Sequence, residues 1–268
     1  MPELPEVETT KNGLQSLLLN KTITKVEILN PNLRWNVDQS IIVKLENQTI
    51  RSFSRRGKYI LFNLGKGYLM VHLGMSGKIN LLDVHEPINK HDHFLLYFDN
   101  DVMRFNDPRR FGSIFYLDNL NHKLLNSLGV EPLEDSFHEN YLFEYSRNKN
   151  QNVKAFIMDS KVVVGVGNIY ACESLHKAGI NPKTKANKIS KKRYVSLTNN
   201  IKQVLNKAIK AGGTTFQDFS KVDGKPGYFS QELSVYGREN ENCFNCNGKI
   251  KRIVQNQRST FYCPKCQK

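Results

Sequence analysis

Four cysteines near the end of the printed sequence constrain its fold more than any other feature. They form two Cys-x-x-Cys pairs separated by 16 residues, a spacing typical of four-cysteine zinc sites. Four thiolates complete a tetrahedral coordination shell and leave no position for a reacting water, so the predicted Zn²⁺ ion is structural. A segment of about 25 residues cannot bury a core of its own, and metal binding would supply its folding free energy. The predicted ligands are Cys243, Cys246, Cys263 and Cys266.

The surrounding sequence favours zinc over two alternatives, a pair of redox-active dithiols and a disulfide framework. No apolar run is long enough to span a bilayer, and the first residues are acidic rather than a basic and then apolar leader. We therefore expect a cytoplasmic protein, in a reducing compartment where disulfides are rare. The fifth cysteine, Cys172, is expected to be a small buried apolar residue. Nothing indicates an obligate oligomer, so we expect a monomer.

The chain carries a strong excess of positive charge. Its 268 residues include 39 Lys and Arg against 25 Asp and Glu, which gives a formal net charge of +14. Such a charge suits a polyanion, and nucleic acid is the first candidate, although a basic surface also suits a membrane surface or solubility alone.

The sequence begins MPELPE, and removal of Met1 would leave the secondary amine of Pro2 at the N-terminus. An α-amine has a pKa of about 7.7 to 8, against about 10.4 for lysine, so far more of it is unprotonated at neutral pH. An unprotonated secondary amine can form an iminium with a carbonyl-like carbon, and the adjacent Glu3 supplies a carboxyl for proton transfer. The simpler interpretation is that these residues start a helix, predicted over residues 3–19.

Residues 22–117 predict a multi-stranded antiparallel sandwich. The apolar or alternating runs are ITKVEIL, IIVKL, YILFNL, YLMVHL, HFLLYF and SIFYL. Three interruptions, RRGK at 55–58, HLGMSG at 72–77 and NDPRRFG at 106–112, carry cations, glycines and bulky apolar side chains. Each could be a solvated hairpin, but together they offer what phosphate contacts and a wedge between stacked bases require.

The second half of the chain is more helical and polar. The turn GVGN at 165–168 leads into a predicted helix, where backbone N–H groups and Asn168, as cap or direct donor, suit a phosphate. A long helix is predicted over residues 190–211, and the loop that follows it has a length typical of functional or disordered loops. Between the cysteine pairs, KRIVQNQRSTFY suits a β-hairpin with Arg258 at or near its tip.

These motifs, in this order, resemble those of the formamidopyrimidine-DNA glycosylases, bacterial base-excision enzymes for oxidised guanine. The resemblance runs through PELPEVE, KYILF, HLGMSGK, NDPRRFG, VVGVGNIYA, DGKPGYF and the zinc module, essentially the whole chain. It implies a bifunctional glycosylase and lyase. Such an enzyme removes oxidised purines, chiefly 8-oxoguanine opposite cytosine and formamidopyrimidines, from double-stranded DNA and cuts the strand by β- and then δ-elimination.

The resemblance also implies catalytic roles. Pro2 would attack C1′ of the flipped nucleotide, and Glu3 would protonate the sugar ring oxygen. Lys58 and Arg258 would assist the eliminations. A phosphate contact suits Arg258 better than proton transfer does, because arginine stays protonated under nearly all conditions.

Further residues are implied to contact DNA. Met75, Arg109 and Phe111 would fill the gap that the flipped nucleotide leaves, with Arg109 facing the orphaned cytosine. The implied DNA contacts are His72, His91, Arg109, Lys149 and Asn168. His91 also belongs to a His-x-His pair, for which a metal site is the alternative. DGKPGYF at 223–229 resembles the segment that closes over the everted base.

Two other functions stay open from the sequence. Endonuclease VIII is a sister enzyme of the same architecture that prefers oxidised pyrimidines; Leu4 and the three gap-filling residues favour the purine enzyme. A non-catalytic DNA-binding zinc protein would bind DNA in a salt-dependent way and form no covalent intermediate.

The predicted fold class is α+β, with several domains. Residues 1–130 are expected to form a catalytic antiparallel β-sandwich with an N-terminal helix, and residues 131–150 a linker. Residues 151–233 are expected to form a helix-two-turn-helix domain with the lesion-capping loop, and residues 234–268 a four-cysteine zinc finger built on a β-hairpin.

Overall fold

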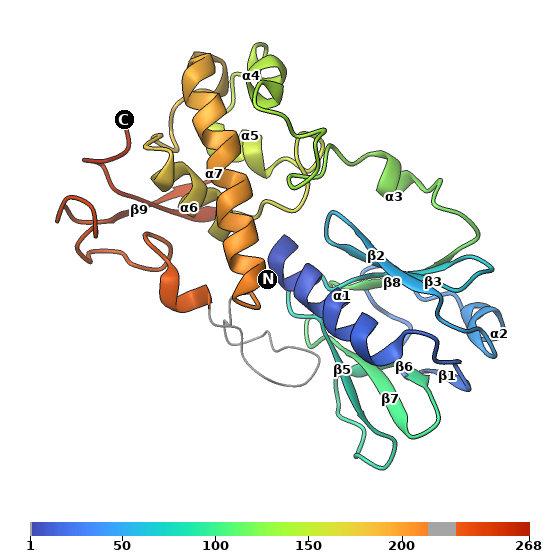
Figure 1. Ribbon diagram of the computed structural model, residues 1–268. Coiled ribbons are helices and arrows are strands. Elements are labelled where there is room, and N and C mark those ends of the chain that lie inside the picture. Colours follow the sequence, from blue (N-terminus) through green and yellow to red (C-terminus); the bar gives the residue numbers. More distant parts are fainter. Residues whose placement is uncertain (1, 214–228) are drawn as a thin grey trace. The chain divides into compact units, whose positions relative to one another are not determined.

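The computed structural model describes residues 2–213 and 229–268 (Figure 1). They fall into two compact units. Unit 1 comprises Met1–Asn126 with Ala211–Ser230, and unit 2 comprises Ser127–Lys210 with Gln231–Lys268. The finer domain boundaries given above stay a prediction.

Unit 1 contains the predicted antiparallel sandwich, built from two four-stranded sheets (Figure 1). One sheet has the strand order β1-β6-β7-β5 and the other β2-β3-β4-β8, and all neighbouring pairs are antiparallel. The strands of the first sheet are β1 (Lys25–Ile28), β5 (Lys78–Asp83), β6 (Asp92–Tyr97) and β7 (Asp101–Asn106). Those of the second are β2 (Ser52–Arg56), β3 (Tyr59–Asn63), β4 (Tyr68–His72) and β8 (Ser113–Leu117).

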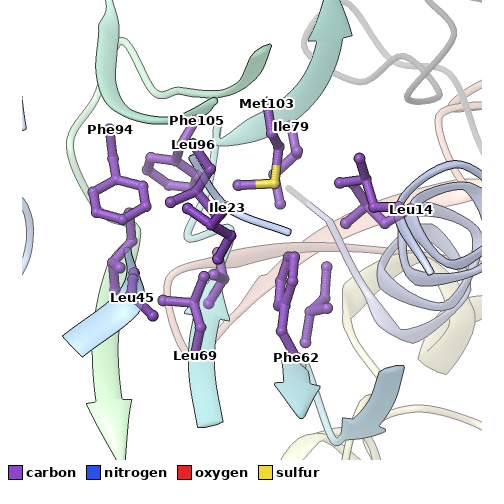
Figure 2. Packing of buried hydrophobic residues seen from close by; sticks show 14 of the residues in the cluster. Leu14, Ile23, Leu45, Phe62, Leu69, Ile79, Phe94, Leu96, Met103 and Phe105 are labelled. Atoms are coloured by element: carbon purple, nitrogen blue, oxygen red, sulfur yellow. The ribbon is translucent and has the colours of Figure 1, made fainter. Parts of the chain in front are cut away.

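One apolar core joins the two sheets. Phe62 and Leu69 of the second sheet and Phe94 and Met103 of the first belong to the same buried cluster, together with Leu14 of the N-terminal helix (Figure 2). Burial of apolar surface is the main favourable term in folding. The core therefore fixes the sheets, and the loops at their ends are held where the strands leave them.

The run IIVKL, predicted as a strand, is the helix α2 (Ile41–Leu45). Ile41 and Leu45 are buried one helical turn apart, whereas Val43 between them is 82% exposed. Periodicity alone does not separate helix from strand in an apolar run of five residues. The strands β2, β5 and β7 were not predicted, because polar side chains interrupt their apolar pattern.

The predicted N-terminal helix is α1 (Leu4–Leu18), and a capping box starts it. Glu3 is the N-cap residue, and its side chain accepts from the backbone amide of Glu6. In return, the Glu6 carboxylate accepts from the Glu3 amide at 2.9 Å. The box satisfies amides that the first helical turn leaves without partners.

Unit 2 is mostly helical and ends in a two-stranded hairpin. The predicted long helix is α7 (Lys191–Lys210), and α4 (Tyr141–Ser146) lies within the segment predicted as a linker. The hairpin turns at Asn256 and Gln257, which both have positive φ, as a two-residue type I′ turn requires. Unit 2 also contains α5 (Val153–Met158), α6 (Asn168–Lys177), η1 (Ala186–Lys188), β9 (Lys251–Gln255) and β10 (Arg258–Tyr262). The chain passes from unit 1 to unit 2 within η2 (Phe229–Glu232), and α3 (Lys123–Asn126) ends the first segment of unit 1. Within the described residues, no helix is long and apolar enough to cross a membrane.

Arg104 of β7 is one of the largest fully buried side chains of unit 1. It donates to the carbonyl oxygens of Glu86 and Pro87, and its guanidinium lies 3.5 Å from the buried Asp92 carboxylate. Asp92 also accepts from the Asn89 amide. This network fastens the segment before β6 to the sheet.

We expect Arg104→Met to lower the free energy of unfolding by about 3 to 5 kcal/mol, because it leaves the Asp92 charge buried without its cation. Arg104→Met with Asp92→Asn should recover part of that loss. Urea denaturation measures both, with the exposed Arg51→Met as the control. A double variant no more stable than the single one would contradict this account.

Candidate functional site

Four of the residues predicted to contact DNA line one groove of unit 1. His72 follows from β4, Met75 lies in the next loop, and Arg109 and Phe111 lie in the turn between β7 and β8. The groove has a volume of about 670 Å³. Phe111 is 43% exposed, and the Arg109 guanidinium lies 5.0 Å from the centre of its ring. An exposed aromatic ring and a cation at a groove are suited to stacking on and pairing with nucleobases.

The groove also contains residues that the sequence analysis did not single out: Asn32, Leu33 and Arg34. Arg110, from the NDPRRFG turn, lines it as well. The Arg34 amide donates to the Gly112 carbonyl at 3.1 Å, which joins the loop before α2 to the β7–β8 turn. The Arg34 guanidinium stacks on Trp35 at 4.7 Å. The sequence signal for this loop was an arginine beside a tryptophan within a polar stretch, PNLRWN.

His72 is neutral at pH 7. Burial, together with the nearby positive charges of Lys58 and Arg34, lowers its pKa to about 4. Its Nδ1 accepts from the Gly74 amide at 3.0 Å, so in the neutral ring Nε2 carries the hydrogen. His72 can thus donate one hydrogen bond to an anion without contributing charge.

The residues predicted for catalysis at the N-terminus are buried. Pro2 is buried and Glu3 is 1% exposed, at the cap of α1. Lys58 is half-buried in the turn between β2 and β3. All three belong to the same unit as the groove.

Arg55 connects α1 with the turn that carries Lys58. Its Nε donates to the Glu8 carboxylate at 2.6 Å, and its second nitrogen donates to the Gly57 carbonyl at 2.8 Å. Burial alone would raise the pKa of Glu8, but hydrogen bonds from Lys11 and Arg55 lower it below its usual value. Arg55, one of the cations expected to contact phosphate, thus pairs with a carboxylate of the protein itself.

In unit 2, Arg258 is exposed at the start of β10 and lines a second groove of about 280 Å³ with the buried Lys154. Lys154 donates to the Ser259 carbonyl at 3.2 Å and to the Thr260 hydroxyl at 2.6 Å. Asn168 donates to the same Ser259 carbonyl at 2.9 Å. Two helices thus hold the strand that carries Arg258.

Asn168 is the first residue of α6, and Gly167 is the cap, so the cap role expected for Asn168 is wrong. Its Oδ1 atom is buried and accepts no hydrogen bond within the described residues. The buried His93 donates from Nε2 to the Asp107 carbonyl. Among the described residues, only the four cysteines form a group of three or more potential metal ligands, which argues against a metal at the His-x-His pair. His91 precedes β6 and is half-buried.

Lys149 is exposed after α4. All of the predicted capping segment DGKPGYF except Phe229 lies outside the described residues.

The four cysteines predicted to bind zinc lie together, as expected. Their sulfur atoms are all within 4.8 Å of one another, with contacts of 3.8 Å for Cys243–Cys266 and 3.4 Å for Cys246–Cys263. A tetrahedron with Zn–S bonds of about 2.3 Å has sulfur atoms about 3.8 Å apart, so the cluster fits a Zn²⁺ ion. Cys172 is buried in the same apolar cluster, as predicted.

His176 of α6 adds an outer contact to this cluster, since its Nε2 lies 3.6 Å from the Cys243 sulfur. Both side chains are buried. Hydrogen bonds to metal-bound ligands orient them and raise metal affinity. The fold therefore supports the ion beyond its four ligands.

We expect His176→Phe to bind zinc about tenfold more weakly, because the thiolate of Cys243 loses a donor in a buried site. Competition with a chromogenic chelator measures the affinity directly. His176→Gln, which keeps an N–H donor, should lose less. Equal affinities for the protein and His176→Phe would contradict the role of the imidazole.

His72 predicts a pH dependence of stability. Its pKa in the folded protein, about 4, lies below the ordinary 6.5. As the pH falls from about 6.5 to about 4, the unfolded chain binds a proton that the folded protein does not, so the free energy of unfolding decreases. His72→Asn keeps an acceptor for the Gly74 amide and should lose less stability between pH 7 and pH 5 in urea denaturation. An unchanged loss in the variant would show that His72 is not responsible.

Comparisons with known proteins match this arrangement along the whole chain. Three family models match: the formamidopyrimidine-DNA glycosylase N-terminal domain at residues 1–114, its H2TH domain at 128–220, and the zinc finger found in FPG and IleRS at 241–268. The formamidopyrimidine-DNA glycosylase of Ruthia magnifica is 58% identical over 268 residues, and that of Idiomarina loihiensis 50% over 271, each covering 100% of both chains.

Solved structures agree with the sequence matches. An FPG mutant of Lactococcus lactis in complex with Fapy-dG-containing DNA superposes with a TM-score of 0.93 at 33% identity, over 100% of both chains. The Lactococcus lactis Fpg with abasic-site DNA also gives 0.93 at 33% identity, over 99% of both chains. The chain thus belongs to the formamidopyrimidine-DNA glycosylase family.

Proposed function

We propose that this protein excises oxidised purines, chiefly 8-oxoguanine opposite cytosine and formamidopyrimidines, from double-stranded DNA in base excision repair, and then cuts the strand. The observation that carries the proposal is the groove of unit 1. Residues from separate loops, His72, Met75, Arg109 and Phe111, line it together and offer a neutral donor, a flexible apolar side chain, a cation and an exposed ring. Those are the groups needed to hold a duplex from which one base has been everted.

The chemistry begins at Pro2, whose secondary amine attacks C1′ of the everted nucleotide. The bond between C1′ and the base breaks, and the base leaves with the bonding electrons and a proton. Glu3 donates a proton to the ring oxygen as the sugar opens, which leaves an iminium between Pro2 and C1′. The buried capping box supports this role, because it fixes the backbone of Glu3 directly after the nucleophile.

The strand is cut in two eliminations from this iminium. Loss of a proton from C2′ expels the 3′-phosphate, and a further proton loss expels the 5′-phosphate, so a one-nucleotide gap with phosphates at both ends remains. Lys58 moves protons in these steps. Arg258, which is exposed on the hairpin, holds phosphates around the lesion.

The remaining predicted residues bind the duplex. His72, His91, Lys149 and Asn168 contact its backbone, while Met75 and Phe111 fill the gap and Arg109 faces the orphaned cytosine. Zinc bound by the four cysteines supplies no chemistry, since its coordination shell is complete; it holds together the hairpin that carries Arg258. We place the protein in the cytoplasm as a monomer bound to DNA.

Borohydride trapping on a duplex with 8-oxoguanine opposite cytosine tests the proposal. Borohydride reduces the iminium to a stable amine, so the protein should become linked to DNA, and peptide mapping should place the link at Pro2. Pro2→Gly, which lacks the secondary amine, should excise 8-oxoguanine at least about a hundredfold more slowly. Pro5→Ala in the first turn of α1 is the matched control and should stay active.

Each outcome decides between functions. A link at a lysine would overturn Pro2 as nucleophile, and DNA binding without any link or strand cut would favour a non-catalytic DNA-binding protein. A duplex with thymine glycol separates the sister activity: faster release of thymine glycol than of 8-oxoguanine would favour an endonuclease VIII-like enzyme. Intact mass of the same preparation tells whether Met1 has been removed, as the mechanism requires.

A further inference from the structure

One buried carboxylate joins the two loops that carry the gap-filling residues. The Ser76 hydroxyl, next to Met75, donates to Oδ1 of Asp107 at 2.6 Å. The Gly112 amide, next to Phe111, donates to Oδ2 of the same side chain at 2.8 Å. Asp107 is 0% exposed, and Ser76 is buried as well.

The Arg109 backbone is held at the same place. Its amide lies 3.3 Å from both the Ser76 hydroxyl oxygen and Oδ1 of Asp107. Each gap-filling residue therefore either contacts the Asp107 carboxylate through its own backbone amide or is the direct neighbour of a residue that does. The side chains of Met75, Arg109 and Phe111 themselves are half-buried or exposed.

The backbone of Asp107 is fixed in turn by β6 and by the residue that precedes this strand. His93 donates from Nε2 to the Asp107 carbonyl at 2.8 Å, and the Asp107 amide donates to the His91 carbonyl at 3.0 Å. A displacement of the Asp107 carboxylate would therefore break the backbone hydrogen bonds to His91 and His93.

Two glycines bring the loops close enough for these bonds. A Cβ on Gly74 would lie 2.4 Å from the carbonyl carbon of Phe111, and Gly74 has a φ of +64° that other residues rarely adopt. A Cβ on Gly112 would lie 2.9 Å from the His72 carbonyl oxygen. The two backbones are in direct contact, so a displacement of one loop displaces the other.

We propose that Asp107 and Ser76 form a clamp that sets the positions of Met75, Arg109 and Phe111 before DNA binds, which makes both of them positioning residues for base eversion. This inference rests on the proposed function. Exposed side chains on loops lose conformational freedom when they bind, and groups held in advance lose less. The clamp supplies that order through buried hydrogen bonds, while the side chains themselves stay accessible to the base stack.

Ser76→Ala tests the clamp with the smallest change, since it removes one hydroxyl. Excision should be measured on two duplexes, one with 8-oxoguanine opposite cytosine and one with 8-oxoguanine opposite a tetrahydrofuran site. On the first, kcat/KM should fall about tenfold, the effect of losing one hydrogen bond to a charged group. On the second it should change less than twofold, because no base pair must be broken and no orphaned base must be received.

The matched control is Ser113→Ala. Ser113 is also buried in unit 1, at the start of β8, and its hydroxyl has no hydrogen-bond partner within the described residues. It should leave both duplexes unaffected. Asp107→Asn should repeat the Ser76→Ala pattern more strongly, with thermal unfolding measured to separate it from loss of fold.

A double-mutant cycle tests the route of action. If the clamp works through the gap-filling residues, Ser76→Ala should add little to the loss already caused by Phe111→Ala on the cytosine duplex. Additive losses would mean that Ser76 acts elsewhere.

The outcomes separate the clamp from the proposed function. If the unaltered protein excises from neither duplex, the proposed function fails. If it excises from both and Ser76→Ala lowers both equally, or lowers neither, the clamp is wrong and the function stands.

Discussion

Burial of apolar surface between two antiparallel sheets is the constraint on which unit 1 depends. A single cluster takes side chains from both sheets and from α1, so the strands cannot shift without exposing it. The candidate site residues lie where the strands end: His72 closes β4, Met75 follows it, and Arg109 and Phe111 precede β8. The core is buried, and it fixes the strand ends from which those side chains extend.

Buried polar groups fix the loop conformations more precisely than the apolar core does. Asp107, Asp92 and Arg104 are all buried, and each makes hydrogen bonds to loop backbone. A buried charge without partners is costly, so such residues allow few alternative loop conformations. The buried carboxylates Asp92 and Asp107 therefore define loop positions, while the net charge of +14 suits an anionic partner.

The sequence predicted best what depends on local chemistry. The two Cys-x-x-Cys pairs, the long helix and the hairpin were all found, because spacing and period determine them. The prediction was wrong at IIVKL, where a helix buries Ile41 and Leu45 on one face. It also missed β7, where Arg104 interrupts the apolar pattern because the partners of Arg104 lie in another segment. Arg34 and the contact between Arg55 and Glu8 were missed for the same reason: only the folded chain brings those segments together.

In unit 2, buried contacts likewise fix the backbone that carries an exposed candidate site residue, but the element is a β-hairpin and not a sandwich. Two strands joined by a two-residue turn are marginally stable alone. Here the hairpin has support from two sides, the four cysteines at its base and the donors Lys154 and Asn168 on the Ser259 carbonyl. Because Arg258 is the residue just before Ser259, its backbone is held while its side chain is exposed. The phosphate contact proposed for Arg258 requires both a defined backbone position and a side chain that can reach outward, and in this hairpin the two properties come from different groups.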